Sequence, residues 1–273
     1  MLVRTISSIV FLMVVIPCIL LSNTSLFIVF TFFLSLAAAY EMLKCNGLHK
    51  NVGIAISIYL LSALPILPRL IGVDNFYRIA FPLVFVCAFV FLSVYTFLRN
   101  KPELGKAVSS WFFTAYAVIG FTSLVILAEL RGGAWHIMFL PFLASWITDT
   151  FALITGMLFG KHKLLPSVSP KKTVEGAIGG SLFCMLFFVL YAFLLNRFFD
   201  FEIRSYLLIA ICGLVCSFVA IVGDLVFSAV KRASGIKDFG KLMPGHGGIL
   251  DRFDSLVSIS IVLLMFISVT NIF

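Results

Sequence analysis

The sequence predicts an all-α polytopic membrane protein with about nine transmembrane helices, an N-terminus in the cytoplasm and a C-terminus on the opposite side. Of its 273 residues, 62% are hydrophobic and only 12% are charged, and the mean hydropathy is +1.15. Apolar runs of about 20 residues, the length that a helix needs to cross the hydrocarbon core of a bilayer, recur along the chain. The Lys and Arg residues gather in alternate loops, which sets the orientation.

Polar interruptions divide the chain into nine apolar runs, and each run predicts one helix. The expected helices are 5–22, 26–43, 54–71, 79–98, 111–128, 134–159, 174–198, 205–230 and 253–273. The first run follows Arg4 and is similar to a signal peptide, but no small-residue cleavage site follows it, whereas further spans do. We therefore expect the first run to stay in the protein as a span.

The distribution of basic residues decides which end of each helix faces the cytoplasm. With the N-terminus inside, the cytoplasmic side holds 15 of the 20 Lys and Arg residues. The other side holds only Arg69, Arg78, Arg131, Arg197 and Arg204. This bias is what the positive-inside rule predicts. The two most basic loops, 160–173 and 231–252, then face the cytoplasm together.

Charge and cysteine content narrow the partners and the compartment. The net charge is +8, but the basic residues lie in short loops against the membrane, which favours membrane lipids and nucleotide phosphates over nucleic acid. The six cysteines form no C-x-x-C pair and predict neither a disulfide nor a zinc site. Short loops and a basic cytoplasmic side favour a bacterial plasma (inner) membrane, with an organelle membrane as the alternative. A homodimer is an option that nothing in the sequence demonstrates.

The chain divides into two regions of different character. Residues 1–130 are apolar with small loops and predict a transmembrane scaffold. Residues 131–273 predict a transmembrane catalytic region with the cytoplasmic loops 160–173 and 231–252. Half of the twelve acidic residues lie in or beside the cytoplasmic ends of the last four predicted helices: Asp149, Glu175, Asp224, Asp238, Asp251 and Asp254. Acids inside spans are costly and usually line a polar cavity.

Asp149 is the acid that lies deepest in a predicted span. It sits about ten residues, or about 15 Å at helical rise, from the cytoplasmic end. Ala152, Gly156 and Gly160 follow at small-x-x-x-small spacing, which favours close helix packing around this carboxylate. The alternative is a structural acid that bonds Thr or Trp side chains.

A second acid, Asp224, precedes Ser228 and Lys231 at intervals of four and three residues. This spacing places an acid, a hydroxyl and a cation on one face of the helix. A helix end in solvent would explain Lys231 and Arg232, since cations near a helix C-terminus are favourable. It would not explain Asp224, which lies deeper, so we expect a functional role for that residue.

Asp251 and Asp254 lie three residues apart, where a helix would place them on one face with Asp251 in its first turn. Together with Asp149 and Asp224 they form an oxygen-ligand set suited to Mg²⁺.

The glycine-rich stretch GHGG precedes these two acids. It supplies backbone that can approach a phosphate closely, with N–H groups free to point at anions. We favour phosphate contact for His246 over a role as general base or structural donor. A simple glycine-rich turn between helices is the alternative.

The loop KHKLLPSVSPKKTVEG predicts a second phosphate-binding element. Ser169-Pro170 starts a turn, and Lys171 and Lys172 lie just before a helix that begins near Thr173; helix N-termini attract phosphate. Thr173 is a suitable N-cap with Glu175 close behind it. Whether Glu175 caps the helix or takes part in catalysis stays open.

These polar residues resemble the signature of a known family. The family pattern is S-x-x-K-R-x-x-x-x-K-D followed by H-G-G-x-x-D-R-x-D, and it belongs to the phosphatidate cytidylyltransferases, also called CDP-diacylglycerol synthases. The matching residues are Ser228, Lys231, Arg232, Lys237, Asp238, His246, Gly247, Gly248, Asp251, Arg252 and Asp254, with Pro244 before them. The signature spans 27 positions, which makes chance agreement very improbable.

A second block also resembles this family. It comprises Asp149, Ala152, Gly156, Phe159 and Gly160, then Ser169, Pro170, Lys172, Thr173, Glu175 and Gly176. Where many members carry a tyrosine after the alanine, this chain has Leu153. The resemblance covers the last half of the chain, and the first 130 residues match only in hydropathy.

The resemblance implies an enzyme of phospholipid biosynthesis that transfers a cytidylyl group from CTP to phosphatidate and yields CDP-diacylglycerol and pyrophosphate, with Mg²⁺ required. The catalytic candidates are Asp149, Lys172, Asp224 and Asp251. The metal-binding candidates are Asp149, Asp224, Asp251 and Asp254, with room for a second cation. The substrate-binding candidates are Ser228, Lys231, Arg232, Lys237, Lys241, His246, Gly247, Gly248 and Arg252.

Two other functions fit part of the pattern. A transporter of a phosphorylated solute would also hold acids within its spans, but we find no internal repeat, and the polar residues gather on one side of the membrane. A CDP-alcohol phosphatidyltransferase would carry D-x-x-D-G-x-x-A-R, whereas Asp251 and Asp254 are followed by Ser255.

Overall fold

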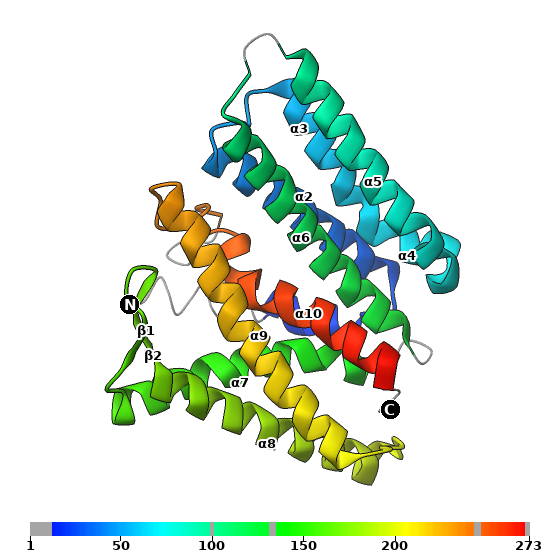
Figure 1. Cartoon of the computed structure of the whole chain (residues 1–273). Coiled ribbons are helices and arrows are strands. Elements are labelled where there is room, and N and C mark those ends of the chain that lie inside the picture. The colour runs from blue at the N-terminus through cyan, green and yellow to red at the C-terminus, as the bar shows by residue number, and fades with distance from the viewer. Residues whose placement is uncertain (1–12, 99–100, 131–134, 243–246, 271–273) are drawn as a thin grey trace. The chain divides into compact units, whose positions relative to one another are not determined.

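The computed structural model describes residues 13–98, 101–130, 135–242 and 247–270, and most of them are helical (Figure 1). Within these residues, seven helices are long and apolar enough to cross a membrane. They are Ser25–Cys45, Val52–Ile71, Leu104–Glu129, Trp135–Phe159, Val174–Phe199, Tyr206–Ala233 and Leu250–Thr270. The prediction of an all-α polytopic membrane protein is therefore confirmed.

The other two predicted spans are only partly represented among these helices. Residues 13–20 are helical, and the rest of the predicted 5–22 helix lies mostly outside the described residues. The predicted 79–98 helix corresponds to α5 (Val73–Phe97), which starts six residues earlier, and whose apolar part, Pro82–Phe97, is shorter than the seven spans. The number nine stays a prediction.

The elements follow one another along the chain with short connections. Their bounds are α2 (Ser25–Cys45), α3 (Val52–Tyr59), the 3₁₀ helix η1 (Leu60–Ile66), α4 (Leu67–Ile71), α5 (Val73–Phe97), α6 (Leu104–Glu129), α7 (Trp135–Phe159), β1 (Lys163–Leu165), β2 (Ser169–Thr173), α8 (Val174–Phe199), α9 (Tyr206–Ala233) and α10 (Leu250–Thr270).

The chain forms two compact units. The first unit comprises Met1–Trp135 and Ala233–Phe253, and the second comprises His136–Arg232 and Asp254–Phe273. The sequence-based division at residue 130 follows chain order, so it assigns 233–253 to the C-terminal region; in the structure this segment groups with the N-terminal unit. Helix α10 contributes its first turn to the first unit and its remainder to the second.

In the first unit, the predicted helix 54–71 is interrupted. α3 ends at Tyr59, the chain continues as the 3₁₀ helix η1, and α4 completes the span. The physical cause is Pro65 together with Pro68, since each proline lacks an N–H donor and its ring crowds the preceding turn. Around this span, α2 packs against α6 and η1, and α3 packs against α5.

Hydropathy also misplaced the start of α6, which was predicted at residue 111 and begins at Leu104. The first turns of α6 contain polar residues such as Lys106, which forms an ion pair with Glu103 at 3.1 Å. A hydropathy window locates the apolar part of a helix, whereas backbone hydrogen bonding continues into polar turns. The helix is therefore longer than its apolar core.

In the second unit, glycines let α7 and α8 approach closely. A Cβ atom added at Gly176 would lie 2.6 Å from the carbonyl oxygen of Ala152, and one added at Gly180 would lie 2.7 Å from that of Thr148. The same holds at Gly223, where α9 packs against Ser258 of α10. Two of the small residues that predicted close packing, Ala152 and Gly156, thus lie against α8, whereas Asp149 itself is exposed.

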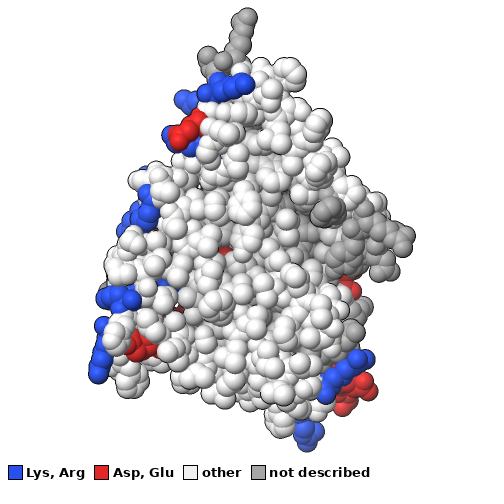
Figure 2. All heavy atoms as spheres, in the orientation of Figure 1, with Lys and Arg blue, Asp and Glu red and all other residues white. Residues whose placement is uncertain are grey.

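Loop 160–173 forms a two-stranded antiparallel hairpin, β1 with β2, where the sequence predicted only a loop with a turn. Thr173 ends β2 and is the N-cap of α8, as predicted, because its hydroxyl accepts a hydrogen bond from the N–H of Gly176 at 3.1 Å. Within this unit, charged side chains gather at the hairpin end and around the α8–α9 loop, and the surface between them is almost free of charged atoms in this view (Figure 2).

Candidate active site

Asp224 on α9 is the centre of a polar group in the second unit. Its Oδ2 atom lies 2.5 Å from Nζ of Lys172, and its Oδ1 atom accepts a hydrogen bond from the Ser228 hydroxyl at 3.2 Å. Lys172 comes from β2, so the hairpin brings this cation to the helix face that carries the acid. About a quarter of each charged side chain is exposed, with values of 26% for Lys172 and 27% for Asp224. The predicted stacking of Asp224 and Ser228 on one helical face is confirmed.

Asp254 on α10 adds a second carboxylate to this group. It is 8% exposed, and the charged groups that act on it include Asp224, Lys231 and Asp149. The second unit therefore brings together acids from α7, α9 and α10. Burying a carboxylate carries an effective penalty of several kcal/mol unless opposite charge or hydrogen bonds compensate it. For Asp254, Lys231 and a hydrogen bond from the N–H of Ser255, at 2.7 Å, supply part of that compensation, and a divalent cation would supply more.

Asp251 belongs to the first unit, where it organises the segment that we call the glycine turn (residues 239–242 and 247–250). Its Oδ2 atom accepts hydrogen bonds from the N–H groups of Phe239, at 2.8 Å, and Gly248, at 2.9 Å. Gly247 has φ +89°, a conformation that favours glycine. The N–H of Gly248, predicted to be available to a phosphate, donates to the Asp251 carboxylate.

Glu41 on α2 is a buried acid that the sequence analysis did not single out. It is 4% exposed, and its carboxylate accepts hydrogen bonds from the N–H groups of Ile249, at 2.8 Å, and Leu250, at 2.9 Å. It is the only acidic residue among the first 73 residues. That isolation at the end of an apolar run was the signal in the sequence, but nothing local identifies a partner that lies 208 residues away.

The remaining substrate-binding candidates are divided between the two units. Lys231 and Arg232 end α9 in the second unit, where Lys231 is buried and Arg232 is exposed. The first unit holds Lys237, Lys241 and Arg252, all of them exposed. His246 lies outside the described residues.

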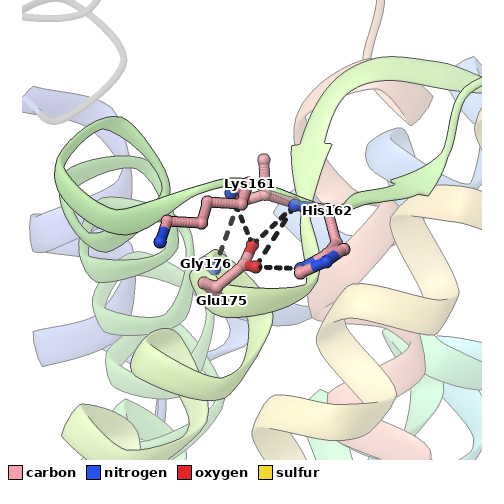
Figure 3. Close-up of polar contacts among 5 residues, drawn as sticks. Lys161, His162, Glu175 and Gly176 are labelled. Atoms are coloured by element: carbon pink, nitrogen blue, oxygen red, sulfur yellow. Dashed lines mark hydrogen bonds and ion pairs between the residues drawn. The ribbon is translucent and has the colours of Figure 1, made fainter.

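Glu175 joins the start of α8 to the chain segment that leads into the hairpin (Figure 3). Its carboxylate accepts hydrogen bonds from the N–H groups of Lys161, at 3.1 Å, and His162, at 3.2 Å. The Nδ1 atom of the His162 ring lies 2.6 Å from the same carboxylate. Since Thr173 already caps α8, these contacts favour a structural role for Glu175, which anchors the hairpin that carries Lys172.

We therefore expect Glu175→Gln to loosen the hairpin while turnover falls by less than about tenfold. The amide keeps the shape of the side chain but removes its charge and one acceptor, and hydrogen bonds to charged groups are the stronger ones. Limited trypsin digestion should cleave the variant faster at Lys161 and Lys163. Turnover that disappeared while the digestion rate was unchanged would instead place Glu175 in the chemistry.

Comparison with known proteins assigns the chain to a family. The model described as "Cytidylyltransferase family" matches residues 2–270. The chain is similar to proteins named phosphatidate cytidylyltransferase from Staphylococcus haemolyticus, at 36% identity, Staphylococcus saprophyticus, at 38%, and Staphylococcus aureus, at 37%. Each comparison covers 93% of this chain and 94% of the relative.

The match extends well beyond the blocks that carry the resemblance in sequence. It includes the first 130 residues, where the sequence offered only hydropathy, and the identity exceeds a third over nearly the whole chain. The resemblance stated from the two polar blocks is confirmed, and this membrane protein belongs to the cytidylyltransferase family.

Proposed function

We propose that this protein transfers the cytidylyl group of CTP to phosphatidate, which forms CDP-diacylglycerol and pyrophosphate for phospholipid biosynthesis. The observation that carries the proposal is the polar group of the second unit, where Lys172 and Ser228 contact Asp224 beside a further buried aspartate. Lys172, Ser228 and the buried Asp254 belong to the blocks that resemble the family. The names of the staphylococcal relatives support the same activity.

The carboxylates of the second unit suit a divalent cation. Asp149, Asp224 and Asp254 are electrostatic neighbours, yet within the described parts of the chain no three His, Cys, Asp or Glu side chains come close enough to form a complete metal cage. Mg²⁺ is usually held by one or two carboxylates with waters and substrate phosphates, so an incomplete protein shell is compatible with it. Bound Mg²⁺ would neutralise charge on the triphosphate.

The paired spacing of Asp251 and Asp254 in the sequence also makes Asp251 a candidate ligand for a cation. Its Oδ2 atom accepts two hydrogen bonds from the glycine turn, and a carboxylate has lone pairs for about four partners, so these two bonds are compatible with that role. A second cation is part of this proposal.

The residues of this chain act mainly by position and charge. An oxygen of the phosphatidate headgroup attacks the α-phosphorus of CTP, the bond to the β-phosphate oxygen breaks, and pyrophosphate leaves. The attacking oxygen is already anionic, so the reaction needs no strong general base. Lys172 and Lys231 lie beside the aspartates and can offset the negative charge of the phosphates, and Arg232, Lys237, Lys241 and Arg252 supply further cations.

The charge distribution of the second unit supports the proposed orientation. The hairpin end presents the exposed Lys161, Lys163 and Lys171, whereas the α8–α9 loop carries two acids, Asp200 and Glu202, and one arginine, Arg204. By the positive-inside rule the hairpin faces the cytoplasm. CTP is soluble in the cytoplasm and phosphatidate lies in the leaflet, so both substrates reach that side. We propose a bacterial plasma (inner) membrane as the location, with the N-terminus inside.

Purified protein is expected to incorporate α-labelled CTP into a lipid-extractable product when phosphatidate and Mg²⁺ are present. Omission of phosphatidate, or chelation of Mg²⁺ with EDTA, should reduce the label in the lipid phase to background. Folded protein that gave no labelled lipid but bound phosphatidate or nucleotide would refute the transfer and favour transport of a phosphorylated solute.

A further inference from the structure

We infer that Glu41 is a positioning residue for cytidylyl transfer, and that its carboxylate holds the glycine turn and the start of α10 in their working geometry. This inference rests on the proposed function. Glu41 contributes no group to the reaction itself. It acts through the backbone of Ile249 and Leu250, which directly precede Asp251.

Burial shows that the contact is specific. A carboxylate that is 4% exposed in a transmembrane helix is strongly unfavourable unless hydrogen bonds or charge stabilise it. Here the two oxygens accept separate N–H groups, Oε1 from Ile249 and Oε2 from Leu250. Both groups lie at the N-terminus of α10, where the helix dipole favours negative charge. The first turn of α10 is thus fastened to α2.

Two glycines of the turn leave room for this carboxylate. A Cβ atom added at Gly240 would lie 3.0 Å from the carboxyl carbon of Glu41, and one added at Gly248 would lie 2.5 Å from it. The same Cβ at Gly240 would also lie 3.1 Å from Cα of Gly248. The backbone on both sides of the turn therefore closes around Glu41, in a space that a side chain would fill.

The turn is held by a second acid at the same time. Asp251 bonds the N–H groups of Phe239 and Gly248, while Glu41 bonds those of the next two residues after Gly248. Three consecutive N–H groups, from residues 248 to 250, thus donate to two carboxylates. Loss of the Glu41 carboxylate would free two of them and release the segment that carries Gly247, Gly248 and Asp251.

The first test compares Glu41→Gln with Glu129→Gln. Gln keeps the volume of Glu41 but places an NH₂ group where one carboxylate oxygen accepts a hydrogen bond. Glu129 is a matched control, because it is a partly buried acid of the same unit whose carboxylate pairs with a side chain, that of Arg69, at 2.6 Å. Hydrogen exchange followed by mass spectrometry would report the amides of residues 248–250, and label incorporation from CTP would report turnover.

For Glu41→Gln we expect exchange in the turn to become at least about tenfold faster, kcat to fall at least about tenfold and the KM for CTP to rise. Glu41→Asp keeps the charge on a shorter side chain, so it should restore part of the protection from exchange and part of the kcat. Glu129→Gln should leave both readouts within about twofold of the parent. If Glu41 served only the stability of the fold, Glu41→Gln would lower the melting temperature, and the protein that remained folded would keep the KM of the parent.

Should Glu41→Gln fail to fold, Gly240→Ala tests the same contact from the other side. The added methyl group crowds the Glu41 carboxylate, whereas Gly105→Ala adds a methyl group whose nearest neighbour, outside its own helix backbone, is 4.0 Å away. Only Gly240→Ala should speed exchange in the turn and lower kcat.

Unchanged exchange in the turn, or fast exchange with unchanged kinetics, would overturn the inference. Parent protein that made no labelled lipid would overturn the proposed function, while the exchange data would still show whether Glu41 holds the turn.

Discussion

Asp224→Asn is expected to lower kcat for cytidylyl transfer by at least about a hundredfold, with the protein still folded. Asn keeps an oxygen that can accept a hydrogen bond from the Ser228 hydroxyl. It removes the negative charge, which Lys172 contacts at 2.5 Å and which a bound cation would need. Label incorporation from CTP at saturating Mg²⁺ measures the effect. Glu202→Gln is the control, because this exposed acid lies in the α8–α9 loop and should be silent.

A double variant separates catalysis from stability at this site. Asp224→Asn removes the ionic partner of Lys172, and a charge left without its partner in a partly buried place lowers stability. Combining it with Lys172→Met removes both charges, so the melting temperature should recover while turnover stays low. Recovery of turnover in the double variant would mean that Asp224 serves only to neutralise Lys172.

The second large effect is expected at Gly247, where Gly247→Ala should inactivate the enzyme or raise the KM for CTP at least about tenfold. A left-handed backbone costs a non-glycine residue about 1–2 kcal/mol, and Gly247 has φ +89°. In addition, the new Cβ would lie 2.7 Å from Oδ2 of Asp251, the oxygen that holds the turn. Strain and steric conflict therefore act on the same hydrogen bonds.

Gly235→Ala is the matched control for this prediction. Gly235 also has a left-handed backbone, with φ +69°, but a Cβ added there would meet nothing within 4 Å. Both variants carry the backbone strain, and only Gly247→Ala disturbs Asp251. Steady-state kinetics with varied CTP would compare them, and equal losses would show that strain alone, without the contact to Asp251, explains the effect.

The class of the protein and most of the polar residues of its candidate site could be predicted from the sequence. Apolar runs of membrane-spanning length establish a polytopic helical protein, because a bilayer leaves few other structures for such a chain. The capping preference of threonine was sufficient to predict Thr173 as the N-cap of α8. Helical periodicity was sufficient to predict that Asp224 and Ser228 share one face. The two polar blocks also identified the family before any comparison over the whole chain.

Tertiary structure alone decided which distant groups meet. The pairing of Lys172 with Asp224 depends on a short hairpin that no hydropathy pattern reveals. Likewise, the hydrogen bonds from the start of α10 to Glu41 join residues more than 200 positions apart. Periodicity describes one element at a time, whereas a buried carboxylate is stabilised by whichever donors the fold brings to it. For that reason the sequence could show that Glu41 was unusual, but only the packed helices could show what it holds.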